Sequence, residues 1–290
     1  MKIDDSSIFD MISHYDYSNH HFKIRAYQMT DQLIFDVHEK IATIRLNRPD
    51  KYNAFTAEML EAWAGALREA SIREDVHVIV VTGTGKGFCS GGDVGNMHNR
   101  KEDSAYSRKL FLSDHVHQIP LTLETIDKPV LVAVNGVATG AGMDMALMGD
   151  IRIAARSARF AETYVKVGIF AGDGGTWYLP RIVGMSKALE LFWTARFVDA
   201  EEALSLGIVN KVVDDDQLMP ATYEMASQIS VQPQLAVRMM KRAAKQSMAM
   251  DLRTHLEMAS SHMAAMYSTE DHKEAATAFK EKRPPVFTGR

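Results

Sequence analysis

Two glycine-rich segments contain the residues whose types and spacing could do chemistry. They cover residues 87–93 (GFCSGGD) and 136–144 (GVATGAGMD) of the 290-residue chain, and each follows an apolar run typical of a buried strand, at 76–81 and 130–134. Glycine allows a tight turn at a strand end and leaves the neighbouring N–H groups accessible. Two such turns together can hold one oxygen that gains negative charge. The pattern predicts an oxyanion hole, with a pair of merely tight connections as the alternative.

Other sequence patterns argue against other chemistries. Residues 83–87 (GTGKG) lack the glycine spacing of a phosphate-binding loop and the Ser or Thr after its lysine. His115 and His117 are two residues apart on a predicted helix, hence on different faces, so no metal site is expected. Cys89 is the only cysteine, which excludes an internal disulfide. The glycines near it favour a small-residue role over a nucleophilic one.

Composition limits the class of protein and its partners. With 46% hydrophobic and 24% charged residues, the chain can form one large domain or a domain with a helical appendage. A net charge of −4 without a long basic run predicts no nucleic-acid partner. No apolar stretch approaches the roughly 20 residues that span a bilayer, and the N-terminus lacks the regions of a secretory signal. We therefore expect no membrane association and a reducing, cytoplasmic location.

The elements that must position the glycine-rich turns can be followed along the chain. Residues 1–28 are polar and show no sustained period, which predicts a flexible or peripherally docked extension. Runs at 33–37 and 41–46 predict a hairpin. Thr56 is a suitable N-cap for an amphipathic helix at 57–70.

Strands and helices alternate through the middle of the chain, which predicts an α/β fold. A helix at about 105–126 separates the two glycine-rich turns. A strand at 151–154 is followed by the turn at 172–175 (GDGG) and a helix near 175–180, and from about residue 186 the pattern is mostly helical. We divide the chain into an extension at 1–28, a core at 29–200 and a C-terminal helical region at 201–290.

Five segments occur in the order and approximate spacing of one known family. They are residues 46–55 (LNRPDKYNAF), 87–93, 128–150, 168–175 and 278–284 (AFKEKRP). On these motifs, the chain from about residue 33 to 287 resembles the enoyl-CoA hydratase/isomerase, or crotonase, superfamily. The resemblance implies a spiral of ββα units with a C-terminal helical region used in trimerisation. A homotrimer or a dimer of trimers is the expected assembly.

The resemblance also implies a coenzyme A thioester as substrate. It makes the backbone N–H groups of Gly92 and Ala141 the oxyanion-hole donors. Loss of one such donor typically costs about 2.7–4 kcal/mol of barrier stabilisation. No cofactor is expected, because coenzyme A enters as part of the substrate.

Four further residues are implied in binding the coenzyme A part of the substrate. Arg48 and the backbone of Ser90 lie in the matched segments near the first glycine turn. Phe279 and Lys282 match a C-terminal pair that can contact the nucleotide from a neighbouring subunit. For Arg48, a solvated surface charge is an equal alternative.

The chain departs from the hydratase pattern at two positions. Hydratases of the superfamily carry glutamates at the positions matched by Asp144 and Tyr164, where the pair holds and deprotonates a water. Asp144 keeps a carboxylate that is one methylene shorter. A tyrosine with an ordinary pKa of about 10 cannot be a resting base at neutral pH. Water addition by the usual pair is therefore in doubt.

Other acids could replace the missing glutamates. Asp144 is the first candidate for the base, since superfamily members that move double bonds in dienoyl thioesters carry an aspartate there; a carboxylate favoured by the helix N-terminus is the alternative. Asp173 is the second candidate, since isomerases and hydrolases carry an acid at or next to this position; a turn-forming or N-capping role is the alternative. Glu162 and Tyr164 would share a face if their segment is extended. They could then reach the same cavity, or both could be hydrogen-bonded wall groups.

These features predict an enzyme, a lyase or isomerase, that binds an unsaturated acyl-CoA and stabilises its enolate. The missing glutamates favour double-bond isomerisation over hydration. Hydrolysis of a C–C bond or of the thioester is one alternative, suggested by the Gly-Asp-Gly turn. A non-catalytic acyl-CoA-binding scaffold is another.

Overall fold

The computed structural model describes residues 30–93 and 104–290. The extension predicted at residues 1–28 lies outside this part of the chain. Among the described residues, no helix combines the length and the apolar character that a bilayer crossing needs.

The first two strands form the predicted hairpin. β1 (Leu33–His38) pairs antiparallel with β2 (Ile41–Leu46). Glu39 and Lys40, the two residues between them, have φ values of 48° and 67°. Two consecutive left-handed residues make the tight turn whose twist matches that of the paired strands. The hairpin prediction is confirmed.

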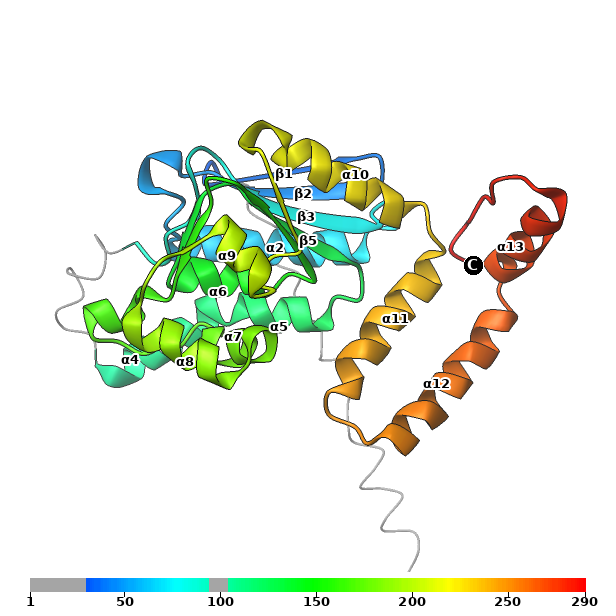
Figure 1. The fold of residues 1–290 in the computed structure, drawn as a ribbon. Coiled ribbons are helices and arrows are strands. Elements are labelled where there is room, and N and C mark those ends of the chain that lie inside the picture. Colours follow the sequence, from blue (N-terminus) through cyan, green and yellow to red (C-terminus); the bar gives the residue numbers. More distant parts are fainter. Residues whose placement is uncertain (1–29, 94–103) are drawn as a thin grey trace, which may run out of the picture.

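Two sheets build the core of the molecule (Figure 1). The larger has six strands in the order β1-β2-β3-β5-β7-β10, and the smaller has four in the order β4-β6-β8-β9. The remaining strands are β3 (Val78–Gly83), β4 (Gly87–Cys89), β5 (Val130–Val134), β6 (Val137–Thr139), β7 (Ile151–Ala155), β8 (Arg159–Ala161), β9 (Val198–Asp199) and β10 (Lys211–Val213).

Successive strand pairs divide between the two sheets. β3, β5 and β7 are parallel neighbours in the larger sheet. The strands that directly follow them, β4, β6 and β8, are parallel neighbours in the smaller sheet, in the same order. Helical segments follow each pair, so the chain advances by one ββα unit per turn. This arrangement is the expected ββα spiral, and it places both glycine-rich turns at the carboxyl ends of adjacent strands.

Apolar helix faces cover the sheets. α2 (Ala57–Ile72) begins at the predicted N-cap Thr56, whose hydroxyl accepts a hydrogen bond from the Met59 N–H at 3.2 Å. Its buried face, which includes Trp63 and Leu67, packs against β1, β2 and a helix of the middle region. Further helical segments are η2 (Pro49–Lys51), α6 (Ala141–Leu147), η4 (Thr163–Val167), α7 (Gly175–Val183), α8 (Met185–Thr194), α9 (Ala200–Ser205) and η5 (Asp215–Gln217).

The helix predicted at 105–126 is present, but a π turn interrupts it. The structure has three segments there, α4 (Ala105–Phe111), the π-helical turn η3 (Leu112–Val116) and α5 (Gln118–Thr125). Pro120 contributes to the interruption, because it has no N–H for the carbonyl of Val116 and its ring crowds that carbonyl. The N–H of His117 donates to the carbonyl of Leu112, five residues earlier, at 2.8 Å.

The core continues beyond the predicted boundary at residue 200. β10 pairs with β7 in the larger sheet, and α10 (Leu218–Ser230) packs across β3 and β5. The chain leaves the sheet only at α11 (Gln234–Ser247). The boundary therefore falls about 30 residues later than composition and periodicity indicated, because short elements return to the sheet.

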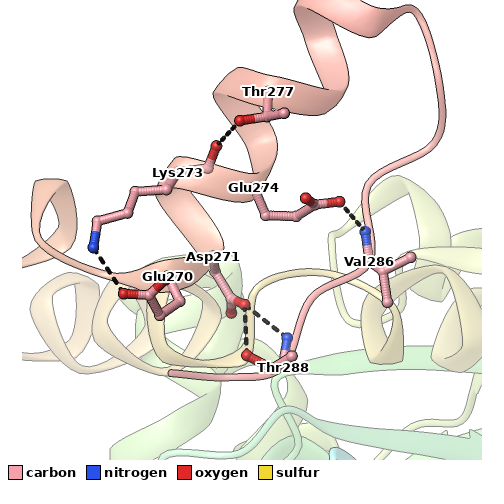
Figure 2. Close-up of a pocket in the computed structure, with 7 residues that line it drawn as sticks. All are labelled: Glu270, Asp271, Lys273, Glu274, Thr277, Val286 and Thr288. Carbon is pink, nitrogen blue, oxygen red and sulfur yellow. Dashed lines mark hydrogen bonds and ion pairs between the residues drawn. The ribbon is translucent and has the colours of Figure 1, made fainter.

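Three helices, α11, α12 (Leu252–Tyr267) and α13 (Glu270–Glu281), form a C-terminal arm beside the core (orange to red in Figure 1). The tail after α13 folds back on that helix, and Figure 2 shows the hollow between them. The Thr288 N–H donates to Asp271 at 2.7 Å, and the Val286 N–H donates to Glu274 at 2.9 Å. Glu274 also pairs with Arg283 at 2.6 Å. These contacts fix the tail to α13.

Candidate active site

The two glycine-rich turns touch each other. A Cβ atom at Gly91, whose φ is +92°, would lie 3.3 Å from the carbonyl of Thr139 and 3.5 Å from the amide nitrogen of Ala141. A Cβ atom at Gly142 would lie 1.9 Å from the carbonyl of Cys89. Glycine at these positions is what allows the end of β4 to pack against the start of α6.

Among the described residues, no backbone acceptor pairs with the N–H groups of Gly92 and Ala141. The Phe55 N–H donates to the carbonyl of Gly91 at 2.8 Å, and the Asp93 N–H donates to the carbonyl of Phe55 at 3.1 Å. These two hydrogen bonds involve the residues on either side of Gly92 and leave its N–H unused. Ala141 is the first residue of α6, so its N–H has no acceptor within its own helix. Within the described part of the chain, both amides are available to a ligand.

Three of the predicted acid–base residues meet one helical turn away from Ala141. The Tyr164 hydroxyl lies 2.7 Å from Asp144 Oδ2 and 2.9 Å from Asp173 Oδ2, and all three side chains are buried. A phenol has one proton, so it can donate to only one carboxylate at a time. Both contacts can be hydrogen bonds only if one of the two carboxyl groups carries a proton. The geometry thus describes a tyrosine that shares protons with two aspartates.

Asp144 has the environment of a base that works near neutral pH. Burial raises the pKa of its carboxyl to about 6, against the opposing effect of hydrogen bonding from Tyr164 and from the backbone of Gly175. A Cβ atom at Gly175 would lie 2.1 Å from Asp144 Oδ1. The first turn of α7 therefore requires glycine to leave space for this carboxyl. Asp144 Oδ1 is itself buried and has no hydrogen-bond partner of good geometry among the described residues.

Glu162 lies against this group and is 1% exposed. Neither of its carboxyl oxygens accepts a hydrogen bond from an N–H or hydroxyl group of the described residues, and the Asp144 carboxyl is the side-chain group that it can hydrogen-bond when protonated. Burial raises the pKa of Glu162 well above its ordinary value, and the nearby Asp144 and Asp173 raise it further. An uncompensated buried charge is costly, so the neutral acid is the form that this site favours.

The local backbone differs from the extended segment that was expected around Glu162. Strand β8 ends at Ala161, and Glu162 precedes the 3₁₀ helix η4, which contains Tyr164. Both side chains still reach the same buried cluster. Burial, followed by the charges of Asp144 and Asp173, raises the pKa of Tyr164, so its phenol is neutral and acts as a donor.

The side chain of His117 was not predicted to take part in this region. Its Nε2 lies 2.9 Å from the carbonyl oxygen of Gly172, the residue before Asp173. The two residues are 55 positions apart, and no periodicity within the helix indicates their contact. The feature that draws attention to His117 is the π turn before it, because such turns are frequent at functional sites. This turn is visible in the structure and has no clear signal in the sequence.

Cys89 lies beside the first glycine turn in a structural role. It is completely buried, and its thiol donates to the carbonyl of Asn53 at 3.2 Å. Burial raises the pKa of the thiol to about 12. A thiol that stays protonated at neutral pH is a poor nucleophile, in agreement with the small-residue role that was predicted.

Arg48 and Ser90 border the first glycine turn. Arg48 forms an ion pair with Asp93 at 2.9 Å and donates to the carbonyl of Ala54. This half-buried guanidinium holds the turn and is not a freely solvated charge. The Ser90 N–H donates to the carbonyl of Tyr52 at 3.0 Å.

Phe279 and Lys282 are not brought to the glycine turns of the same chain. Both belong to the end of α13, which lies at the opposite side of the molecule from α6 in Figure 1. The Phe279 side chain is 86% exposed. A contact between this pair and a nucleotide at the glycine turns would have to come from another subunit.

Together these groups can carry out proton transfer next to a carbonyl. Two free N–H groups offer a place for a negative oxygen, and a carboxylate with a raised pKa lies in the same helix as one of them. No group of three or more His, Cys, Asp and Glu side chains that could hold a metal ion occurs among residues 30–93 and 104–290.

Comparison with known proteins gives consistent matches over most of the chain. The sequence profile described as enoyl-CoA hydratase/isomerase matches residues 36–290. The crotonyl-CoA hydratase of Syntrophomonas wolfei is 36% identical over 263 residues, which cover 89% of this chain and 98% of that protein. The 1,2-epoxyphenylacetyl-CoA isomerase of Escherichia coli is 33% identical over 262 residues, covering 90% and 100%.

Solved structures agree with the observed architecture. An enoyl-CoA hydratase from Bacillus anthracis aligns with a TM-score of 0.82 and 32% identity over 89% of this chain and all of that one. An enoyl-CoA hydratase from Mycobacterium smegmatis aligns with a TM-score of 0.83 and 33% identity, covering 89% and 99%. The predicted α/β spiral fold is confirmed.

Proposed function

The chain belongs to the enoyl-CoA hydratase/isomerase family, and we propose that it moves the double bond of an unsaturated acyl-CoA thioester. The thioester oxygen would lie between the N–H groups of Gly92 and Ala141. Asp144 would be the base, with Tyr164 and Asp173 controlling its protons and Glu162 as a neutral neighbour. A site of this kind belongs to an enzyme, either a lyase or an isomerase of this family.

The proposed reaction consists of two proton transfers. The Asp144 carboxylate removes a proton from the α carbon of a 3-enoyl thioester, and the C–H electron pair moves through the carbonyl carbon onto the thioester oxygen. The two N–H groups stabilise the negative charge on that oxygen. Protonated Asp144 then gives the proton to the γ carbon, the electron pair moves back from the oxygen along the chain, and the double bond lies between the α and β carbons.

The observation that carries this proposal is the position of the Tyr164 hydroxyl between Asp144 and Asp173, at 2.7 and 2.9 Å. In the hydratases that this chain resembles, two glutamates hold the water that is added to the substrate. Here a neutral phenol, which donates a hydrogen bond and cannot take a proton at neutral pH, occupies the matched position. One base that removes and returns a proton suits isomerisation better than water addition.

Substrate binding and assembly complete the proposal. The coenzyme A part would run past Arg48 and Ser90, and Phe279 and Lys282 would approach it from a neighbouring subunit. A homotrimer or a dimer of trimers supplies that neighbour. Relatives named for hydration and for isomerisation are similarly distant, at 36% and 33% identity, so the comparison alone does not select between the two reactions.

A parallel assay in H₂¹⁸O separates the possible reactions. The purified protein is given 3-hexenoyl-CoA and crotonyl-CoA in separate reactions. Products are separated by liquid chromatography, where 2- and 3-enoyl isomers are distinguished by their retention against standards, and are then identified by mass spectrometry. Isomerisation of the first substrate without ¹⁸O incorporation, faster than hydration of the second, supports the proposal. Faster formation of an ¹⁸O-labelled 3-hydroxyacyl-CoA contradicts it in favour of hydration. A free acid points to hydrolysis, and binding without turnover points to a scaffold.

Asp144→Asn and Asp173→Asn assign the roles of the two acids in the same assay. Asparagine keeps the shape of aspartate and loses the proton-transfer group. We expect Asp144→Asn to lower the rate of isomerisation by about 10²- to 10⁴-fold, and Asp173→Asn to lower it less. An Asp144→Asn variant with full activity would remove Asp144 as the base.

A further inference from the structure

The loop that carries Asp173 contains few features that could fix it by itself. Gly172 and Gly174 flank the aspartate, and Gly174 has a φ of +123°, which side-chain-bearing residues rarely adopt. On its C-terminal side the loop is anchored by α7, since the Tyr178 N–H donates to the carbonyl of Gly174 at 3.0 Å. On its N-terminal side the Thr176 hydroxyl donates to the carbonyl of Ala171 at 3.4 Å. The Gly172 carbonyl next to Asp173 still needs a donor of its own, because glycine-rich backbone is flexible and Asp173 must stay within 2.9 Å of Tyr164.

The imidazole of His117 supplies a contact at that side. Its Nε2 lies 2.9 Å from the carbonyl oxygen of Gly172. A carbonyl can only accept a hydrogen bond, so the proton of this contact is on Nε2 and the histidine donates. The carbonyl of Gly172 and the Cα atom of Asp173 lie in one planar peptide group. A donor that fixes this oxygen therefore also fixes the plane from which Asp173 extends.

The π turn η3 explains how His117 comes to face this loop. The His117 N–H reaches back five residues to the carbonyl of Leu112, at 2.8 Å. One extra residue in a turn rotates the following side chains by about 100° relative to an uninterrupted α-helix. A Cβ atom on Gly172 would lie 3.8 Å from Leu112 Cδ1. Both ends of the π turn thus lie against the Asp173 loop, a location typical of functional π turns.

We infer that His117 is a positioning residue for Asp173, acting through the hydrogen bond from its Nε2–H to the Gly172 carbonyl. The inference rests on the acid–base role of Asp173 proposed above. His117 holds the backbone of the aspartate, and Tyr164 holds its carboxyl group. With both ends fixed, Asp173 stays aligned with the Tyr164 hydroxyl and, through it, with Asp144.

Four variants at His117 and His115 test the inference in the full-length protein. His117→Leu removes the donor. His117→Gln can place an amide N–H where Nε2 lies, whereas the shorter His117→Asn cannot. His115→Leu is the matched control, because the His115 ring packs on Phe111, with centroids 5.0 Å apart, and has no contact with Gly172 among the described residues.

The expected readout is a change in kcat at nearly constant KM. A misplacement of about 1 Å can cost up to roughly 10²-fold in rate, so we expect kcat to fall by about 10- to 100-fold in His117→Leu and His117→Asn. His117→Gln should recover most of the activity, and His115→Leu should keep it. Equal kcat values for the Gln and Asn variants would overturn the inference, and this comparison stands even if His117→Leu does not fold.

A double-mutant cycle shows whether His117 acts through Asp173. In the Asp173→Asn background, His117→Leu should cause no further loss of kcat, because coupled residues are not additive. Full additivity would overturn the inference. Failure of the proposed function has a different signature: the wild type would not isomerise enoyl-CoA, or Asp173→Asn would be as active as the wild type.

Discussion

Three carboxyl groups and a phenol share the interior beside the glycine turns, and they cannot all be charged. Asp144 and Glu162 are almost completely buried, and Asp173 is nearly so. Like charges so close together repel strongly where water is excluded. Burial is the main reason that the pKa of each carboxyl is raised. The cluster therefore keeps protons near neutral pH.

The pKa of Asp144 predicts the acid side of the pH profile. Since burial raises this pKa to about 6, the carboxylate form required of a base is lost below that pH. We expect kcat/KM for isomerisation to fall about tenfold per pH unit below pH 6, with an apparent pKa that belongs to the coupled cluster. Asp144→Asn should lower kcat by about 10²- to 10⁴-fold. A rate that stays constant down to pH 4.5 would argue against a carboxyl base with a raised pKa.

Glu162 predicts a pH dependence of stability. Its pKa is raised in the fold above the ordinary 4.5, so its contribution is fully present below pH 4.5 and is lost as the pH rises through the folded-state value. The loss can reach about 1.4 kcal/mol per pH unit for one proton. Glu162→Gln cannot ionise, so its Tm relative to the wild type should be higher at pH 8 than at pH 5. Glu74→Gln, at an exposed carboxyl, is the control and should show the same offset at both pH values.

At the scale of single residues, the sequence identified the members of the site better than their relations. Asp144, Asp173, Tyr164 and Glu162 were all singled out from motifs and from a family resemblance, and they do meet. The sequence could not predict that both aspartates contact one phenol. These contacts require side chains 9 and 20 positions from Tyr164 to be placed with an accuracy of a few tenths of an ångström. The donor from His117 was missed for the same reason.

Among the elements, the start of α7 is the part most closely adapted to the acid cluster. Gly175 faces the Asp144 carboxyl, and a Cβ atom there would lie 2.1 Å from Oδ1. Gly175→Ala should therefore displace the Asp144 side chain from Tyr164. We expect kcat to fall by about 10- to 100-fold, in line with the cost of a displacement of about 1 Å. Steady-state kinetics, with circular dichroism as the folding control, measures the effect.

Arg181→Ala is the matched variant for that experiment. Arg181 lies in the last turn of α7, its side chain is exposed, and its guanidinium lies over the ring of Trp177 in the same helix. The same helix would then carry an added methyl in one variant and a smaller side chain on the solvent face in the other. Comparable kcat losses in both would mean that α7 is generally sensitive, and that the space beside Asp144 has no special role.

Elements with a clear period were predictable, and elements shaped by single contacts were not. Alternation predicted the hairpin, and helical spacing with the Thr56 cap predicted α2. Both elements and the cap are present. The segment at 105–126 has the composition of one helix, but Pro120 and the five-residue hydrogen bond of His117 divide it. The position of β10 was missed because a strand of three residues gives almost no periodic signal.

At the scale of the whole molecule, the ββα spiral and the C-terminal arm divide the work. The spiral brings the ends of β4 and β6 together, although they are separated by about 50 residues of chain. The arm is held to the core at α11, where Lys241 Nζ lies 2.6 Å from Asp150 Oδ2 and donates to the carbonyl of Lys128 at 2.7 Å. Beyond that anchor, α12 has no buried residue over its 16 positions. Its apolar side chains are therefore left uncovered by the described part of the chain.

The pattern of α12 predicts that the partner is another copy of the chain, as the proposed trimer requires. Leu252, Leu256, Met263 and Tyr267 are all exposed and lie at spacings of 4, 7 and 4, which places them in one stripe along the helix. An exposed apolar stripe of this kind marks an interaction surface. Leu256→Glu should therefore convert the assembly to monomers, whereas Ser261→Glu adds the same charge on the opposite face and should leave it intact.

Light scattering after size-exclusion chromatography measures the mass of each variant. A wild type that is monomeric at all concentrations, or a Leu256→Glu variant with the wild-type mass, would contradict this assembly. If the monomer also binds coenzyme A more weakly, the arm of one subunit contributes Phe279 or Lys282 to the site of the next.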